Sequence, residues 1–164
     1  MRNDKLQVGF VGAGWMGATQ MKRLCERDDV TIVALADPNE AGAKAVLAEL
    51  GLPEDVYVKD YEAIVQNPDI AAVWLVSPNC YHGPQAIAAL EAGKHVFCEK
   101  PAATTYADFV REIDLERAHP HLHTFVDYIL YFDAMEQRLR DMVAADEFGQ
   151  ITQIQVNYRH PVNI

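Results

Sequence analysis

The stretch VGFVGAGWMG, residues 8–17, decides the fold of this 164-residue chain. The apolar run over residues 6–11 predicts a short buried strand, and a helical pattern follows the glycines. Gly12 permits a tight turn, Gly14 lets the backbone approach a pyrophosphate, and Gly17 lets the helix pack closely on the strand. The alternative is an ordinary glycine-rich turn. Because these glycines lie between a strand and a helix, we expect instead that a dinucleotide binds at the helix N-terminus. Its expected contacts are Gly12, Ala13, Gly14, Trp15, Met16 and Gly17.

A carboxylate follows the second expected strand at the separation that such a site requires. The β-branched and apolar residues 30–36 predict this strand, and Asp37 stands 20 residues after Gly17. An acidic residue near this separation accepts hydrogen bonds from the ribose hydroxyls of adenosine. The alternative is that Asp37 caps the next helix, since Asp before Pro often begins one. Because only Pro38 and Asn39 follow, with no adjacent cation for a 2′-phosphate, NAD is expected in preference to NADP.

Strand and helix patterns then alternate along the chain. Apolar runs predict strands over residues 56–58, 71–76, 94–98 and 123–127, and helical spacing predicts helices over residues 41–50, 61–65, 84–92 and 104–117. This order requires helical crossovers between parallel strands. The fold class is therefore α/β, with a doubly wound parallel sheet.

Two further strand ends carry residues suited to a binding site. Ser77, Pro78 and Asn79 follow the continuous apolar run 71–76, at the carboxyl edge where open α/β sheets bind ligands. Lys100 follows the next strand. A lysine at a strand end is usually solvated, so its position alone leaves its role open.

Composition narrows the class of partner. The chain has 14 Lys and Arg against 24 Asp and Glu, a net charge of −10, which argues against nucleic acid or an anionic membrane as a partner. No apolar run approaches the roughly 20 residues of a membrane span, and no signal peptide is visible. Cys25, Cys80 and Cys98 are widely spaced and odd in number, which suits unpaired thiols in a reducing cytoplasm.

The segment VSPNCYHGPQAIAALEAGKHVFCEKP, residues 76–101, resembles the signature of the glucose–fructose oxidoreductase, inositol dehydrogenase and MocA-like family. It combines a Pro-Asn turn, a following His, the helix end and strand AALEAGKHV, and the tripeptide EKP. With the glycine turn upstream, the resemblance is specific, and it runs through essentially the whole chain. It implies a Rossmann dinucleotide-binding domain over residues 1–128 and an oxidoreductase that uses NAD or NADP on a sugar, polyol or related hydroxy compound.

The resemblance also implies roles for single residues. Ser77, Pro78 and Asn79 would border the cofactor, and His82 would border the nicotinamide pocket. Lys100 would be the catalytic residue, hydrogen-bonded to the reacting hydroxyl and the cofactor. An ammonium there stabilises negative charge on a carbonyl oxygen and can help to move the proton. Glu99 would position Lys100 and is counted with the cofactor contacts.

The last part of the chain departs from the family pattern. Tyr131 and Ala134 stand where family members usually carry Arg and Pro, which puts the usual interdomain contact in doubt. A helix is expected over residues 134–148 and a half-buried strand over residues 151–160. Residues 129–164 would then begin a C-terminal substrate or oligomerisation domain, an α+β unit. Its unpaired strand suggests a homo-oligomer formed through this sheet.

Three other interpretations are weaker. His119, His121 and His123 alternate as metal ligands on a strand can, but Pro120 intervenes, so a polar turn is favoured and no metal is expected. Cys80 and His82 could form a thiol–imidazole pair, although nothing in the sequence orients them. A non-catalytic dinucleotide-binding module is the alternative function, and the lysine of EKP argues against it.

Overall fold

Six parallel strands form one sheet in the computed structural model, which describes residues 5–157 of the chain. The strand order is β3-β2-β1-β4-β5-β6, so the chain winds outward from β1 in both directions. The strands are β1 (Leu6–Val11), β2 (Val30–Ala36), β3 (Tyr57–Val58), β4 (Ala72–Leu75), β5 (His95–Cys98) and β6 (Thr124–Val126). The predicted doubly wound α/β fold is confirmed.

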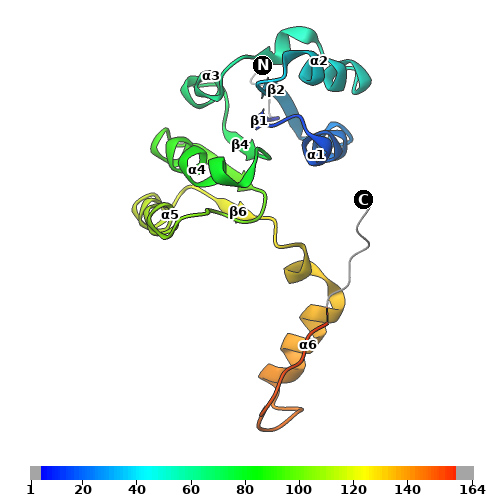
Figure 1. Ribbon diagram of the computed structural model, residues 1–164, viewed down its shortest axis with the longest axis vertical. Coiled ribbons are helices and arrows are strands. Elements are labelled where there is room, and N and C mark those ends of the chain that lie inside the picture. Colours follow the sequence, from blue (N-terminus) through cyan, green and yellow to red (C-terminus); the bar gives the residue numbers. More distant parts are fainter. Residues whose placement is uncertain (1–4, 158–164) are drawn as a thin grey trace. The chain divides into compact units, whose positions relative to one another are not determined.

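Helices cover both faces of this sheet, with α1 and α2 on one side and α3, α4 and α5 on the other (Figure 1). Their bounds are α1 (Trp15–Cys25), α2 (Glu40–Glu49), α3 (Tyr61–Gln66), α4 (His82–Glu91) and α5 (Tyr106–Ala118). Short 3-10 turns η1 (Glu54–Val56) and η2 (Asn79–Tyr81) precede β3 and α4. Each crossover returns the chain to the same edge of the sheet, as parallel strands require.

The apolar core lies in two layers, one on each face of the sheet. Val73 on β4 packs with Ile64 and Leu90, from the helices of the α3–α5 side. Phe10 on β1 packs with Met21 and Leu47, from α1 and α2. Since fully burying such side chains contributes roughly 1.5–3 kcal/mol each, these layers hold the strand ends in place.

The chain divides into two compact units, Met1–Asp127 and Tyr128–Ile164. The second contains η3 (Ile129–Phe132) and α6 (Ala134–Ala144). Asp133 caps α6 by accepting the backbone N–H of Met135 at 2.9 Å. That this unit begins a substrate or oligomerisation domain stays a prediction.

Two expectations for the second unit are wrong where the structure describes it. The helix ends at Ala144 and not at residue 148, and Asp146 has a positive φ of 56°, which is incompatible with helix continuation. Residues 151–157 form no strand, and their side chains are exposed. A strand needs a neighbour for its backbone N–H and C=O groups, and no such neighbour pairs with these residues. Residues 158–160 of the expected strand lie outside the described residues.

Candidate functional site

The glycine turn between β1 and α1 has the geometry that its residues predict. Gly12 has a φ of 107°, and a Cβ there would lie 2.6 Å from the carbonyl oxygen of Val76. A Cβ on Gly17 would collide with the carbonyl oxygen of Gly12. The first turn of α1 has no side-chain cap at Gly14 and no acidic residue within the described structure. Its N–H groups are therefore available to an anion such as a pyrophosphate.

Asp37 lies against this turn at the end of β2. Its Oδ2 accepts the backbone N–H of Ala13 at 2.7 Å, and its Oδ1 accepts that of Asn39 at 2.8 Å. Asn39 is the residue that caps α2, since its Oδ1 accepts the N–H of Gly42 at 3.1 Å. The helix-cap alternative for Asp37 is thus not supported. Each carboxylate oxygen keeps a further lone pair, which a ribose hydroxyl can use.

A cavity of about 980 Å³ opens over the turn and Asp37. This is large enough for a dinucleotide, since ligand pockets typically measure about 300–1,000 Å³. The sequence-predicted residues that line it are Gly12, Gly14, Trp15, Met16, Asp37, Ser77 and Pro78. The fold therefore brings the glycine turn, the carboxylate after β2 and the turn after β4 to one cavity.

Several lining residues were missed from the sequence. Tyr57 and Tyr61 lie at the β3 end of the cavity, with Lys59 between them, and Gln85 lies on α4. The hydroxyl of Ser77 donates a hydrogen bond of 2.6 Å to Oε1 of Gln85. The two-residue strand β3 gives a weak pattern, although its place beside β2 follows from the strand order once that order is known.

Other predicted residues lie near the cavity without lining it. Ala13 and Gly17 hold the turn, and Asn79 begins η2. His82 has only 1% of its surface exposed, and its Nδ1 and Nε2 each lie 2.7 Å from a carbonyl oxygen, of Pro101 and Ser77 respectively. His82 therefore connects two turns and does not line this cavity. That it borders the nicotinamide pocket stays a prediction.

The same contacts test whether Cys80 and His82 form a thiol–imidazole pair. Both of its ring nitrogens are engaged by backbone carbonyls, and Cys80 is exposed at the surface. The imagined thiol–imidazole pair with Cys80 is therefore not formed.

Lys100 is exposed at the same edge of the sheet, outside the lining of this cavity. The backbone N–H of Glu99 donates a hydrogen bond of 2.9 Å to the carbonyl oxygen of Leu75, and the backbone N–H of Val76 donates one of 2.8 Å to the carbonyl oxygen of Val11. The turns after β1, β4 and β5 are thereby held side by side, with Lys100 beyond Glu99. That Lys100 acts on a substrate beside a bound dinucleotide stays a prediction.

Glu99 belongs to a polar network that the sequence did not predict. Its carboxylate accepts hydrogen bonds from the Gln20 side chain at 2.7 Å and from the Lys100 backbone N–H at 3.2 Å. Burial raises the pKa of Glu99, and the neighbouring Asp127 raises it further. The signal in the sequence is faint, because Gln20 and Glu99 are 79 residues apart.

The three alternating histidines do not converge on a common point. His119 Nδ1 lies 3.0 Å from the carbonyl of Leu115, whereas the backbone N–H of His123 donates to Nδ1 of His95 at 3.0 Å. Over residues 5–157, no group of three or more His, Cys, Asp or Glu could hold a metal ion. Nor does any helix in that range have the length and apolarity to cross a membrane.

Comparison with known proteins agrees with this geometry. Residues 6–128 match the GFO_IDH_MocA family model, described as an oxidoreductase family with an NAD-binding Rossmann fold. The inositol 2-dehydrogenase of Salmonella typhimurium is 31% identical over 156 residues, which cover 94% of this chain and 46% of that protein. The inositol 2-dehydrogenase of Pseudomonas fluorescens is 32% identical over 157 residues, with coverage of 95% and 46%.

A solved structure shows the same likeness in three dimensions. The scyllo-inositol dehydrogenase of Lactobacillus casei, with bound NAD(H) and scyllo-inositol, superposes with a TM-score of 0.80 at 28% identity. The match covers 90% of this chain and 43% of that one. The chain thus spans just under half the length of the relatives that it matches.

Proposed function

The chain belongs to the oxidoreductase family with an NAD-binding Rossmann fold that includes the inositol dehydrogenases, and from that membership we propose that it supplies the cofactor-binding part of an NAD-dependent polyol dehydrogenase. The substrate would be a cyclic polyol or sugar. A bound nicotinamide would supply the chemistry of hydride transfer between a hydroxyl-bearing carbon and a carbonyl. The residues of this chain would hold the dinucleotide and handle the proton.

The observation that carries this proposal is the joint placement of the glycine turn and Asp37 on one cavity. The free N–H groups at the start of α1 would bind the pyrophosphate, and the Asp37 carboxylate would accept the ribose hydroxyls. The same carboxylate repels a phosphate on the ribose, so we expect NAD to be preferred over NADP.

Lys100 is proposed as the catalytic residue. Its ammonium, at the end of β5, would stabilise negative charge on the reacting oxygen and exchange the hydroxyl proton. Glu99 would position Lys100 through the hydrogen bond that it accepts from the Lys100 backbone at 3.2 Å. Because a purely dinucleotide-binding module needs no such lysine, the catalytic reading is favoured over that alternative.

Assembly and location are the less specific parts of the proposal. We expect a homo-oligomer formed through the C-terminal part of the protein, and a cytoplasmic setting for a chain with three free cysteines in its described part. Neither nucleic acid nor a membrane is proposed as a partner, given the net charge of −10.

A titration of this chain with NADH and NADPH tests the proposal. Trp15 is 80% exposed at the start of α1, and a bound reduced nicotinamide should quench its fluorescence. NADH should bind saturably and more tightly than NADPH. Activity is tested separately, by adding inositol isomers and NAD to an active protein that contains this chain. If the chain does not bind NADH, the proposal that it supplies the cofactor-binding part is wrong.

A further inference from the structure

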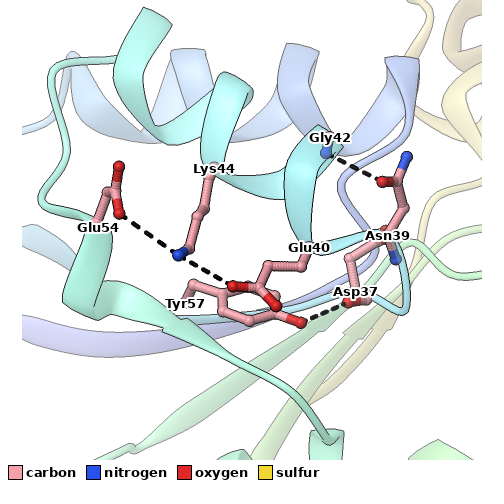
Figure 2. A network of polar contacts seen from close by, with 7 residues as sticks. All are labelled: Asp37, Asn39, Glu40, Gly42, Lys44, Glu54 and Tyr57. Carbon is pink, nitrogen blue, oxygen red and sulfur yellow. Dashed lines mark hydrogen bonds and ion pairs between the residues drawn. The ribbon is translucent and has the colours of Figure 1, made fainter.

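Lys44 on α2 lies between two carboxylates beside the cavity (Figure 2). Its Nζ is 3.0 Å from Oε1 of Glu40 and 3.4 Å from Oε2 of Glu54. Nζ also lies 6.0 Å from the centre of the Tyr57 ring. Glu40 stands four residues before Lys44, the spacing and order that favour a pair on one helix face. The lysine is therefore held by the helix on one side and by η1 on the other.

This cluster forms part of the wall at the ribose end of the cavity. Glu40 and Tyr57 line the cavity together with Asp37, and the Tyr57 hydroxyl donates to the Asp37 carbonyl at 3.3 Å. Burial raises the pKa of Tyr57, and the carboxylates of Glu40 and Asp37 raise it further. A ligand in the cavity therefore meets the carboxylates of Asp37 and Glu40, while the ammonium of Lys44 is directed at Glu40 and Glu54. The part of the wall that follows β3 adds Asp60, Glu62 and one cation, Lys59.

A 2′-phosphate needs a cation at this end of the site. Lysine is a common phosphate ligand, and its four-carbon stem gives it a wide reach. Exposed ion pairs contribute only about 0–1 kcal/mol, so either partner alone would hold Lys44 weakly. Two carboxylates at once leave the ammonium little freedom to turn toward the ribose.

We propose that Glu40 and Glu54 hold Lys44 away from the dinucleotide and that this ion-pair cluster adds to the discrimination against NADP that the Asp37 carboxylate provides. The inference rests on the proposed dinucleotide site. It adds the prediction that the Lys44 ammonium could bind a 2′-phosphate if its ion pairs with Glu40 and Glu54 were removed. Removing both carboxylates would release Lys44 and admit NADPH, even though Asp37 remains in place.

The variant Glu40→Gln/Glu54→Gln tests this by fluorescence titration of the chain with both reduced dinucleotides. We expect NADPH affinity to rise by about tenfold or more, as one charge-assisted contact to a phosphate implies. NADH affinity should change by less than about threefold. Adding Lys44→Met to the double variant should abolish the NADPH gain. The gain should also shrink in high salt, because an exposed ion pair is screened.

Lys22 provides the matched control. It is exposed in the last turn of α1 and is not among the residues that line the cavity. Lys22→Met in the Glu40→Gln/Glu54→Gln background should leave the NADPH gain in place. If the gain is absent, survives Lys44→Met, or is lost with Lys22→Met, the inference is overturned.

The outcomes separate this inference from the proposed function. A parent chain that binds NADH while the double variant gains nothing for NADPH refutes only the role of Lys44. A parent chain that binds neither dinucleotide refutes both. Folding of each variant is checked by circular dichroism, and these surface substitutions should leave it unchanged.

Discussion

The side-chain amide of Gln20 donates a hydrogen bond of 2.7 Å to the carboxylate of Glu99. Gln20 lies on α1, and Glu99 follows β5 with only 8% of its surface exposed. The Gln20 oxygen in turn accepts the indole N–H of Trp74 at 2.9 Å, and its nitrogen lies 3.4 Å from the Asp127 carboxylate. One glutamine thus links the helix of the glycine turn to the residue next to Lys100.

Gln20→Leu should destabilise the chain more at high pH than at low pH. Burial already raises the pKa of Glu99, so its ionised form depends on the remaining donors. Loss of the Gln20 donor raises the pKa of Glu99 further in the folded state. As pH rises above the ordinary glutamate pKa of about 4.3, Glu99 then ionises more easily in the unfolded state, so the free energy of unfolding falls. We expect a loss of about 1–3 kcal/mol in the free energy of unfolding at pH 8 and a smaller loss at pH 5.5. Urea unfolding at both pH values measures it, with Thr19→Ala as the control on α1.

Glu112→Gln should stabilise the chain above neutral pH. Glu112 Oε1 is buried and lacks a hydrogen-bond partner among the described residues, and burial, followed by Asp108, raises the pKa of Glu112 to about 7. The folded state therefore binds the proton more tightly than the unfolded state, and stability falls as pH rises from about 4.5 to about 7. The full shift converts to about 3 kcal/mol. Because Glu112 is only partly buried, we expect a gain of about 1–2 kcal/mol at pH 8.5.

The gain from Glu112→Gln should disappear at pH 5.5, where the native carboxyl is protonated. Asp114→Asn, on the exposed side of the same helix, is the control and should have little effect at either pH. An equal gain at both pH values would show that the buried charge is not the cause.

Local sequence predicted the parts of this fold that local physics determines. The bounds of β1 and β2 match the predicted strands 6–11 and 30–36, because a strand buried on both faces needs mostly apolar residues, and only Gln7 and Thr31 are polar here. The glycine turn was also predictable, since a positive φ at Gly12 and the close packing at Gly17 restrict those positions to glycine.

Contacts made by the tertiary fold were not predictable in the same way. The pairing of Gln20 with Glu99 and that of Lys44 with Glu54 depend on which elements the topology brings together. His82 shows the same limit, because its burial under two turns could not be read from its place after a Pro-Asn turn. The expected strand at residues 151–157 failed for the related reason that strand formation requires a partner.

Gly14→Ala and Gly17→Ala should separate binding from folding. A Cβ on Gly14 meets no atom within 4 Å, and its φ of −64° suits alanine, so the fold should tolerate the change. Because Gly14 lines the cavity, NADH affinity should fall by about tenfold or more. A Cβ on Gly17 collides with the Gly12 carbonyl and should lower the free energy of unfolding by about 1–3 kcal/mol. Thermal unfolding measures the stability of each variant, and NADH titration measures its cofactor affinity. Unchanged NADH affinity in Gly14→Ala would contradict this placement of the pyrophosphate.

Lys100→Met should lower turnover far more than cofactor affinity in an active protein that contains this chain. Lys100 lies at the end of β5, beyond the residues that line the dinucleotide cavity, so its loss leaves the glycine turn and Asp37 intact. The substitution keeps the unbranched stem and removes the ammonium that would stabilise charge on the reacting oxygen. We expect kcat to fall by at least about 10²-fold, as is typical for an acid–base or electrostatic group. The dissociation constant for NADH should change by less than about threefold. Lys59→Met, a lysine that lines the cavity, is the opposite control: it should affect dinucleotide binding and leave kcat nearly unchanged. If Lys100→Met retains full turnover on every polyol that the parent oxidises, the proton must be handled by another group and Lys100 has no part in the chemistry.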